Sequence, residues 1–195
     1  AQVGEGYRRL RNTLRFILSN LYDFDPATDP VDKADLQEID AWVLHRLSEV
    51  ADRVTRAYDA FELHRVYYTL HGFCAVDLSQ IYLDSRKDCL YTFPADHPVR
   101  RSCQTALYYL ADALIRLLAP IVPHTAEEAW QHFKSDEISP KSIHLTPWPT
   151  LSQWQDKTLK DKWDILLQLR EKVAAALEEA KTSGLIRRPL EAKVV

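Results

Sequence analysis

The sequence contains no methionine, only four glycines and only three cysteines in 195 residues. Phosphate-binding loops need glycine at fixed spacings, and Gly4, Gly6, Gly72 and Gly184 form neither GxGxxG nor GxxxxGK[ST]. Both common types of nucleotide-binding loop are therefore excluded from this chain. Because even an initiator methionine is missing, we expect the sequence to be a fragment of a longer protein.

The three cysteines, Cys74, Cys89 and Cys103, are widely spaced and include no CxxC pair. An odd number of separated cysteines argues against a disulfide framework and favours a reducing compartment. The sequence also shows no signal-peptide pattern and no apolar run long enough to span a membrane. We therefore expect a cytoplasmic protein with no membrane partner.

Apolar side chains recur at spacings of three and four along most of the chain, which predicts amphipathic helices. The predicted helices cover about residues 5–22, 35–58, 62–88 and 98–118, a short segment from residue 125, and 159–182. The expected fold class is all-α, an antiparallel helical bundle followed by a C-terminal helix and, in LEAKVV, the start of a strand. The expected domains are 1–134 for the bundle, 135–157 for a proline-rich connector, and 158–195 for the helix and strand.

Two of these helices carry start signals. Asp96 or His97 is expected to cap the fourth helix, with Pro98 in its first turn. Thr125 and Glu128 have the spacing of a capping box, which would begin the fifth helix. The connector that follows is expected to be extended around SIHLTPWPT.

The first predicted helix has two distinct faces. Stepping about 100° per residue gathers the apolar side chains into one stripe and arginines into a second stripe about 120° away. The apolar stripe consists of Leu10, Leu14, Ile17 and Leu21, and the cationic stripe of Arg8, Arg11 and Arg15. Asn12 lies at the edge of the cationic stripe, and the next acidic residue along the chain is Asp23. Guanidinium groups in such a row suit phosphates and base edges, and a solvated helix face is the alternative interpretation.

The formal net charge of −3 differs from the basic bias of most free-standing nucleic-acid-binding domains. Any such contact must therefore come from a local patch, and the first helix is the strongest one. No catalytic set of residues stands out, and His64, His71 and Cys74 are too few ligands for a metal site. Trp148 could stack on an unstacked base, but packing between its flanking prolines is the favoured interpretation.

Four pieces of the chain resemble, in this order, the anticodon-binding region of class I aminoacyl-tRNA synthetases. They are YRRLRNTLRFILSNLYDFDP, IYLDSRKDCLY, RRSCQTALYYLADALIRLLAPIVPHTAEEAW and the terminal LEAKVV. Together they span about residues 5 to 195, and within the class they are most similar to the isoleucine-specific enzymes. The segment GLIRRPLEA departs from the family pattern, because relatives usually have a small or glycine-containing run before LEA.

The resemblance implies a tRNA-binding module that does not catalyse a reaction itself. It implies contact with isoleucine tRNA through Arg8, Arg11, Asn12 and Arg15 on the first helix, with second-rank candidates at Arg86, Lys87, Arg100, Arg101, Gln104 and Trp148. The catalytic HxGH and KMSKS signatures are absent, so no cofactor is expected in this fragment, and ATP and magnesium would belong to the catalytic domain of the parent enzyme. The catalytic and editing domains of that parent are the other expected partners. Two alternatives remain open: a helical protein-interaction scaffold, and the same domain from a valine or methionine enzyme.

Overall fold

The computed structural model describes residues 2–133, 140–188 and 191–193. The chain divides into two compact units, Ala1–Gln155 and Asp156–Val195, which are considered separately. The described residues contain helices and no strand, as the all-α prediction requires. None of the helices in these ranges has the length and apolar character needed to cross a membrane.

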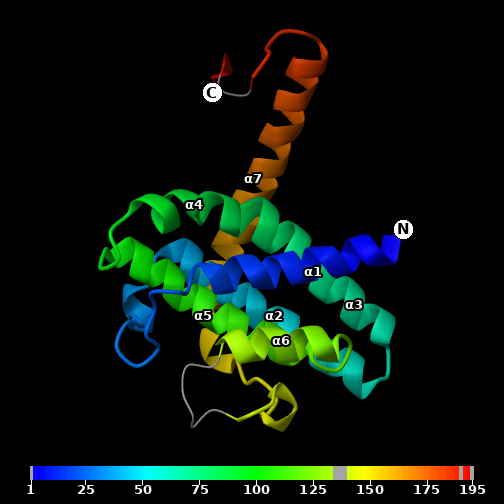
Figure 1. Cartoon of the computed structure of the whole chain (residues 1–195). Helices are drawn as coiled ribbons and strands as arrows, with labels where there is room; N and C mark the ends of the chain where they lie inside the picture. The colour runs from blue at the N-terminus through cyan, green and yellow to red at the C-terminus, as the bar shows by residue number, and fades with distance from the viewer. Residues whose placement is uncertain (1, 134–139, 189–190, 194–195) are drawn as a thin grey trace. The chain divides into compact units, whose positions relative to one another are not determined.

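The first unit is a bundle of α-helices with a π-helical stretch in its middle (Figure 1). Its α-helices are α1 (Gln2–Ser19), α2 (Glu38–Asp59), α3 (Leu63–Gly72), α4 (Leu83–Thr92), α5 (Pro98–Leu118) and α6 (Pro123–Phe133). A π-helix, Phe73–Tyr82, joins α3 directly to α4. Short 3-10 helices cover Lys33–Asp35, Ile143–Leu145 and Ser152–Trp154. The last two lie in the connector, which is therefore less extended than the sequence predicted.

Helix α5 forms the centre of the bundle and packs against α1, α2, α4 and α6. His97, one of the two residues predicted to cap this helix, is its N-cap. The His97 ring nitrogen accepts a hydrogen bond from the Val99 amide at 3.2 Å. Pro98 follows in the first turn. Apolar side chains along α5 are fully enclosed, including Leu107, Leu110 and Leu114. This helix therefore supplies the core on which the other helices are positioned.

Helix α1 buries three of the four side chains of the predicted apolar stripe, whereas Leu21 lies beyond the end of the helix and is only partly buried. Leu10, Leu14 and Ile17 are all at most 3% exposed. The helix ends at Ser19, three residues earlier than predicted, where the Asn20 side chain donates a hydrogen bond to the Phe16 carbonyl at 2.8 Å. The last carbonyl groups of a helix have no partner within the helix, and the Asn20 side chain supplies one for Phe16, so the helix can end here.

The third predicted helix exists as one continuous element, but its centre is π-helical and not α-helical. The wider turns of a π-helix change which side chains face inward. The buried side chains of the π-helix are Phe73, Cys74, Leu78 and Tyr82. The Tyr82 hydroxyl donates to the buried Asp40 carboxylate at 2.7 Å. This long-range hydrogen bond favours the altered register, and a 3.6-residue period cannot reveal it.

The capping-box prediction for α6 is wrong. The helix begins at Pro123, a residue type that is favoured in the first helical position. Thr125 therefore lies inside the first turn, and its hydroxyl is 2.8 Å from the Tyr7 hydroxyl of α1. Glu128 is turned toward α1 as well. The two residues hold α1 against α6 instead of starting a helix.

The second unit contains α7 (Lys157–Thr182). The Asp156 side chain caps its start by accepting a hydrogen bond from the Leu159 amide at 2.9 Å. Gly184, with φ +78°, follows its end in the left-handed conformation that glycine favours. The predicted strand is not found at residues 191–193, and the rest of LEAKVV lies outside the described residues.

Candidate nucleic-acid interface

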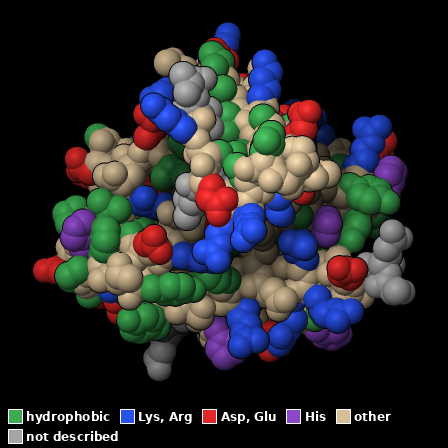
Figure 2. All heavy atoms as spheres, turned by 90° about the horizontal axis from the view of Figure 1, so that it is seen from above, with side chains coloured by type: hydrophobic (Ala, Val, Ile, Leu, Met, Phe, Trp, Pro, Cys, Tyr) green, Lys and Arg blue, Asp and Glu red, His purple; other side chains and the backbone are tan. Residues whose placement is uncertain are grey.

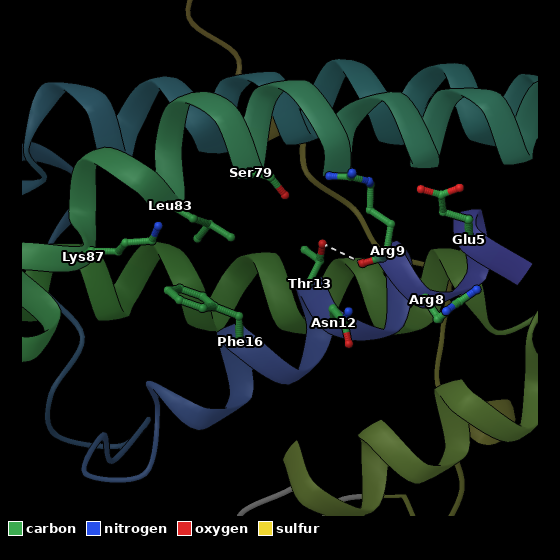
Figure 3. Close-up of a pocket in the computed structure, with 9 residues that line it drawn as sticks. All are labelled: Glu5, Arg8, Arg9, Asn12, Thr13, Phe16, Ser79, Leu83 and Lys87. Carbon is green, nitrogen blue, oxygen red and sulfur yellow. Dashed lines mark hydrogen bonds between the residues drawn. The ribbon is translucent and has the colours of Figure 1, made fainter. Parts of the chain in front are cut away.

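A groove of about 600 Å³ runs between α1 and the helix that packs across it (Figure 3). One wall comes from α1, and the other comes from the end of the π-helix and the start of α4. The residues that line it are Glu5, Arg8, Arg9, Asn12, Thr13, Phe16, Ser79, Leu83 and Lys87. Figure 2 shows lysine and arginine side chains on one face of the molecule.

Three cations and one carboxylate line this groove, namely Arg8, Arg9, Lys87 and Glu5. Within the described ranges, neither Arg8 nor Arg9 has a carboxylate at ion-pairing distance; Arg8 Nε donates instead to the Gly4 carbonyl at 3.2 Å. Figure 3 shows the Arg9 guanidinium extended from α1 toward the opposite wall. The groove therefore holds an excess of positive charge that the domain does not neutralise.

Lys87 contributes the cation of the opposite wall. It donates to Asp84 Oδ1 at 2.8 Å, and this hydrogen bond raises the pKa of the exposed Lys87 ammonium above its ordinary value. Lys87 is therefore fully charged at neutral pH. An ammonium donates up to three hydrogen bonds, so pairing with Asp84 leaves donors for a further acceptor.

Arg9 was missed by the sequence analysis, although it is central to the groove. The helical wheel placed it about 100° from Arg8 and so outside the cationic stripe. The second wall, which makes this face concave, is formed by residues some 70 positions further along the chain. The adjacent arginines in YRRLRNT were the available sequence signal, but they do not show what faces them.

The cationic stripe itself divides between two surfaces. Arg8 and Asn12 line the groove described above. Arg11 instead forms an ion pair with Glu128 of α6, with Nη2 and Oε1 3.2 Å apart. The expectation that this stripe lacks an acidic neighbour is therefore wrong for Arg11, because α6 supplies one from 117 positions away. Arg15 is exposed on the same side of α1.

Arg86, a second-rank candidate, is held inside the bundle. Its Nη2 lies 2.8 Å from Asp40 Oδ2, and the Asp40 side chain is completely buried. Burial alone would lower the pKa of Arg86, but the Asp40 carboxylate, acting together with Cys103, Tyr82 and Cys89, raises it. We therefore assign Arg86 to the structure of the bundle and keep only Lys87 from this pair as an interface residue.

The three candidates that open α5 are also engaged within the bundle. Arg100 pairs with Asp23 at 2.8 Å, and Arg101 pairs with Asp29 at 3.2 Å. Gln104 is 0% exposed, and its amide donates to the Asn20 carbonyl and to Asp23. These contacts fasten the loop after α1 onto α5, so the structure favours a positioning role over direct RNA contact.

Trp148 packs against α2 and not between its flanking prolines. Its Nε1 donates to Thr55 Oγ1 at 2.8 Å, and its ring meets the Tyr58 ring edge-on at 5.5 Å between centroids. The side chain stays partly exposed at 39%. Both contacts are made with α2, so Trp148 anchors the connector to the bundle.

The family pattern described as the anticodon-binding domain of tRNA ligase matches residues 40–195. The chain therefore belongs to this family of anticodon-binding domains. Within it, the chain is 47% identical over 195 residues to an isoleucine–tRNA ligase of Natranaerobius thermophilus. It is 50% identical over 194 residues to an isoleucine–tRNA ligase of Symbiobacterium thermophilum and 46% identical over 194 residues to one of Moorella thermoacetica.

These matches cover nearly all of this chain but only part of each relative. They include 99–100% of the chain and 21% of each of the three isoleucine–tRNA ligases. The resemblance to the isoleucine branch of this class of anticodon-binding domains is thus confirmed. Because most of each relative has no counterpart in this chain, the matches do not by themselves assign the activity or the substrates of a whole ligase to it.

Proposed function

We propose that this domain binds the anticodon arm of isoleucine tRNA as part of an isoleucine–tRNA ligase. The observation that carries the proposal is the groove beside α1, where Arg8 and Arg9 have no carboxylate at ion-pairing distance among the described residues and Lys87 adds a third cation, in a chain whose overall charge is −3. Its membership in a family of anticodon-binding domains supplies the class of ligand.

In this proposal the groove holds the RNA backbone. Guanidinium and ammonium groups neutralise phosphates and release condensed counterions, which supplies sequence-independent affinity. Asn12 and Ser79 add neutral donors and acceptors within the same groove. Such phosphate contacts fix the position of the RNA, and base contacts elsewhere would read its sequence.

The domain would contribute position and not chemistry. By holding the anticodon arm, it would orient the tRNA so that the acceptor end reaches the catalytic domain of the parent chain. The parent reaction would join isoleucine to the tRNA and consume ATP, with ATP and magnesium bound by other domains. The catalytic and editing domains are therefore the proposed partners within the same polypeptide, and the cytoplasm is the proposed location.

A titration of fluorescently labelled isoleucine tRNA at several salt concentrations tests the proposal. We expect log K to fall linearly with log salt, and the slope to become shallower by about 1 when Arg8 or Lys87 is replaced by alanine. Arg53→Ala removes the same charge from α2, outside this groove, and should leave the slope unchanged. A scaffold without an RNA role would show no binding at low salt, and equal competition by valine or methionine tRNA would overturn the isoleucine assignment.

A further inference from the structure

Two of the three cysteines meet where α4 packs against α5. Cys89 lies in the last turn of α4, and Cys103 lies in the second turn of α5. The two helices are tied together beside them, because Arg86 Nη2 donates a hydrogen bond to the Val99 carbonyl at 3.3 Å. The thiols of Cys89 and Cys103 form a hydrogen bond with each other, and neither sulfur is part of a disulfide. Side chains in such contact need little movement to be joined by one.

The two thiols differ in how readily they ionise. Cys103 is fully enclosed with its sulfur 3.6 Å from the Tyr82 hydroxyl, and burial raises the pKa of Cys103 well above its ordinary value. For Cys89, the hydrogen bond with Cys103 lowers the pKa and the Arg86 guanidinium lowers it further, although burial opposes both effects. The neutral Cys89 thiol donates to the Arg86 carbonyl at 3.1 Å, whereas the thiolate accepts from the Cys103 thiol. Because the thiolate is the reactive form of cysteine, Cys89 is the nucleophile of the pair and Cys103 stays protonated.

Cys89 lies close to solvent, whereas the third cysteine is deeply enclosed. Although Cys89 is only 5% exposed, Asp88, Tyr91 and Thr92 around it at the end of α4 are exposed. The last turn of a helix opens more readily than its centre, so small molecules gain access to the Cys89 sulfur. Cys74 lies inside the bundle at 1% exposure, and burial raises the pKa of its thiol to about 12. Cys74 is therefore an internal control for reactivity.

We propose that Cys89 and Cys103 are a modification site at which hydrogen peroxide forms a reversible disulfide between α4 and α5. The Cys89 thiolate attacks one peroxide oxygen, the O–O bond breaks, and the displaced hydroxide takes up a proton and leaves as water. The Cys103 sulfur then attacks the sulfenic acid on Cys89, so that the S–S bond forms, the S–O bond breaks, and the Cys103 proton leaves with the hydroxide as a second water. Two thiols thus lose two electrons, which reduce one peroxide to two waters. A small dithiol reverses the step by thiol–disulfide exchange and is itself oxidised to a disulfide.

Such a crosslink agrees with the cysteine pattern of the sequence. Disulfides in a reducing compartment are usually transient and respond to oxidants, in contrast to the permanent bridges of secreted proteins. Lys87 lies two residues before Cys89 and lines the groove beside α1. The disulfide therefore fastens to α5 the helix that forms one wall of that groove. Its formation does not depend on RNA, so it is tested without RNA.

The test treats the 195-residue chain with hydrogen peroxide, then unfolds it and alkylates the remaining thiols for mass spectrometry. We expect the wild-type chain to lose two of its three alkylatable thiols, a Cys89–Cys103 peptide to appear after digestion, and dithiothreitol to restore all three thiols. The control variant Cys74→Ser should form the same bridge, because Cys74 is not part of the pair. Cys103→Ser should form no bridge and should accumulate a sulfenic acid at Cys89, which dimedone traps. Cys89→Ser should leave Cys103 unlabelled by dimedone.

The wild-type result decides the proposal even if a variant folds poorly, and circular dichroism checks the fold of each variant. Three alkylatable thiols after peroxide treatment, a bridge that includes Cys74, or a bridge between two chains would overturn the proposal. Dimedone labelling of Cys103 in Cys89→Ser would overturn the assignment of Cys89 as the nucleophile. The rate of bridge formation should rise as the pH is raised through the pKa of Cys89, and a rate independent of pH would contradict attack by a thiolate.

Discussion

Arg86 Nη2 on α4 lies 2.8 Å from the Asp40 carboxylate on α2, and the Asp40 side chain is entirely enclosed. Tyr82 and Ser102 donate to the same carboxylate at 2.7 and 2.6 Å. Burial raises the pKa of Asp40, although Arg86 and the two hydroxyl donors oppose this effect. The four residues come from α2, the π-helix, α4 and α5. This network therefore holds the wall of the groove beside α1, since Lys87 is the next residue after Arg86.

We expect Asp40→Ala to lower the free energy of unfolding by about 3–5 kcal/mol, because it leaves the Arg86 guanidinium partly buried without its counter-charge. Urea denaturation of both proteins measures this loss. Asp84→Ala breaks an ion pair of similar length to Lys87 on the same helix, but on the surface, and should cost at most about 1 kcal/mol. Equal losses in the two variants would show that the buried pair has no special weight.

Leu14 lies in the middle of the apolar face of α1 and is 3% exposed. We expect Leu14→Ala to destabilise the bundle by about 2–5 kcal/mol, since it removes buried methyl groups and leaves a cavity between packed helices. The shift of the thermal midpoint reports the loss. Leu63→Ala makes the same chemical change at a side chain that is 52% exposed and should have a much smaller effect. An unchanged midpoint for Leu14→Ala would contradict the assigned core face.

The helical fold could be predicted from the sequence because it depends on local periodicity. Leu10, Leu14 and Ile17 are buried as their spacing indicated. Periodicity does not reveal the π-helix, where Cys74 and Leu78 are buried but so are Phe73 and Tyr82, and Tyr82 donates to Asp40, 42 positions away. The residue pattern of a single helix gives no information about a contact with a residue so distant in sequence.

The candidate site was harder to predict, because charge alone does not distinguish a ligand-binding cation from a structural one. Arg8 and Arg100 are both arginines in helical turns. Arg8 faces an open groove, whereas Arg100 is 6% exposed and is paired with Asp23. Which of these applies depends on acids that are distant in sequence. The same reason explains why the pairing of Arg11 with Glu128 was not foreseen, whereas Arg9 was overlooked because the wall that faces it is distant in sequence.

Glu127 links α6 to the connector, and this link should respond to acid. Its Oε2 accepts hydrogen bonds from Ser142 Oγ at 2.7 Å and from the Ile143 amide at 3.1 Å, and the Ser142 hydrogen bond lowers the pKa of Glu127 below its ordinary value of 4.5. A lowered pKa in the folded state means that the stabilisation is present above pH 4.5 and is lost as the pH falls through the lower folded value.

We therefore expect the amide proton shift of Ile143, followed by NMR, to titrate with a midpoint below 4.5. In Glu127→Gln this titration should disappear, because the amide side chain does not ionise in this range. A midpoint at or above 4.5 in the wild-type protein would contradict the lowered pKa, and a titration that persists in the variant would assign it to another carboxylate.

Arg9 and Arg11 are two positions apart on α1, yet they should lose RNA affinity in different ways when replaced by alanine. Arg9 lines the groove between α1 and α4 and has no carboxylate at ion-pairing distance in the described part of the chain. Arg9→Ala should weaken binding of all tRNAs about equally and make the salt slope shallower by about 1. Arg11 lies outside this groove and pairs with Glu128 of α6, yet its side chain is 43% exposed, so Arg11→Ala should cost about 1–3 kcal/mol for isoleucine tRNA and little for tRNAs with other anticodons. Titrating both variants against isoleucine tRNA and a tRNA with another anticodon separates the two effects, and identical behaviour would mean that the two arginines have the same role.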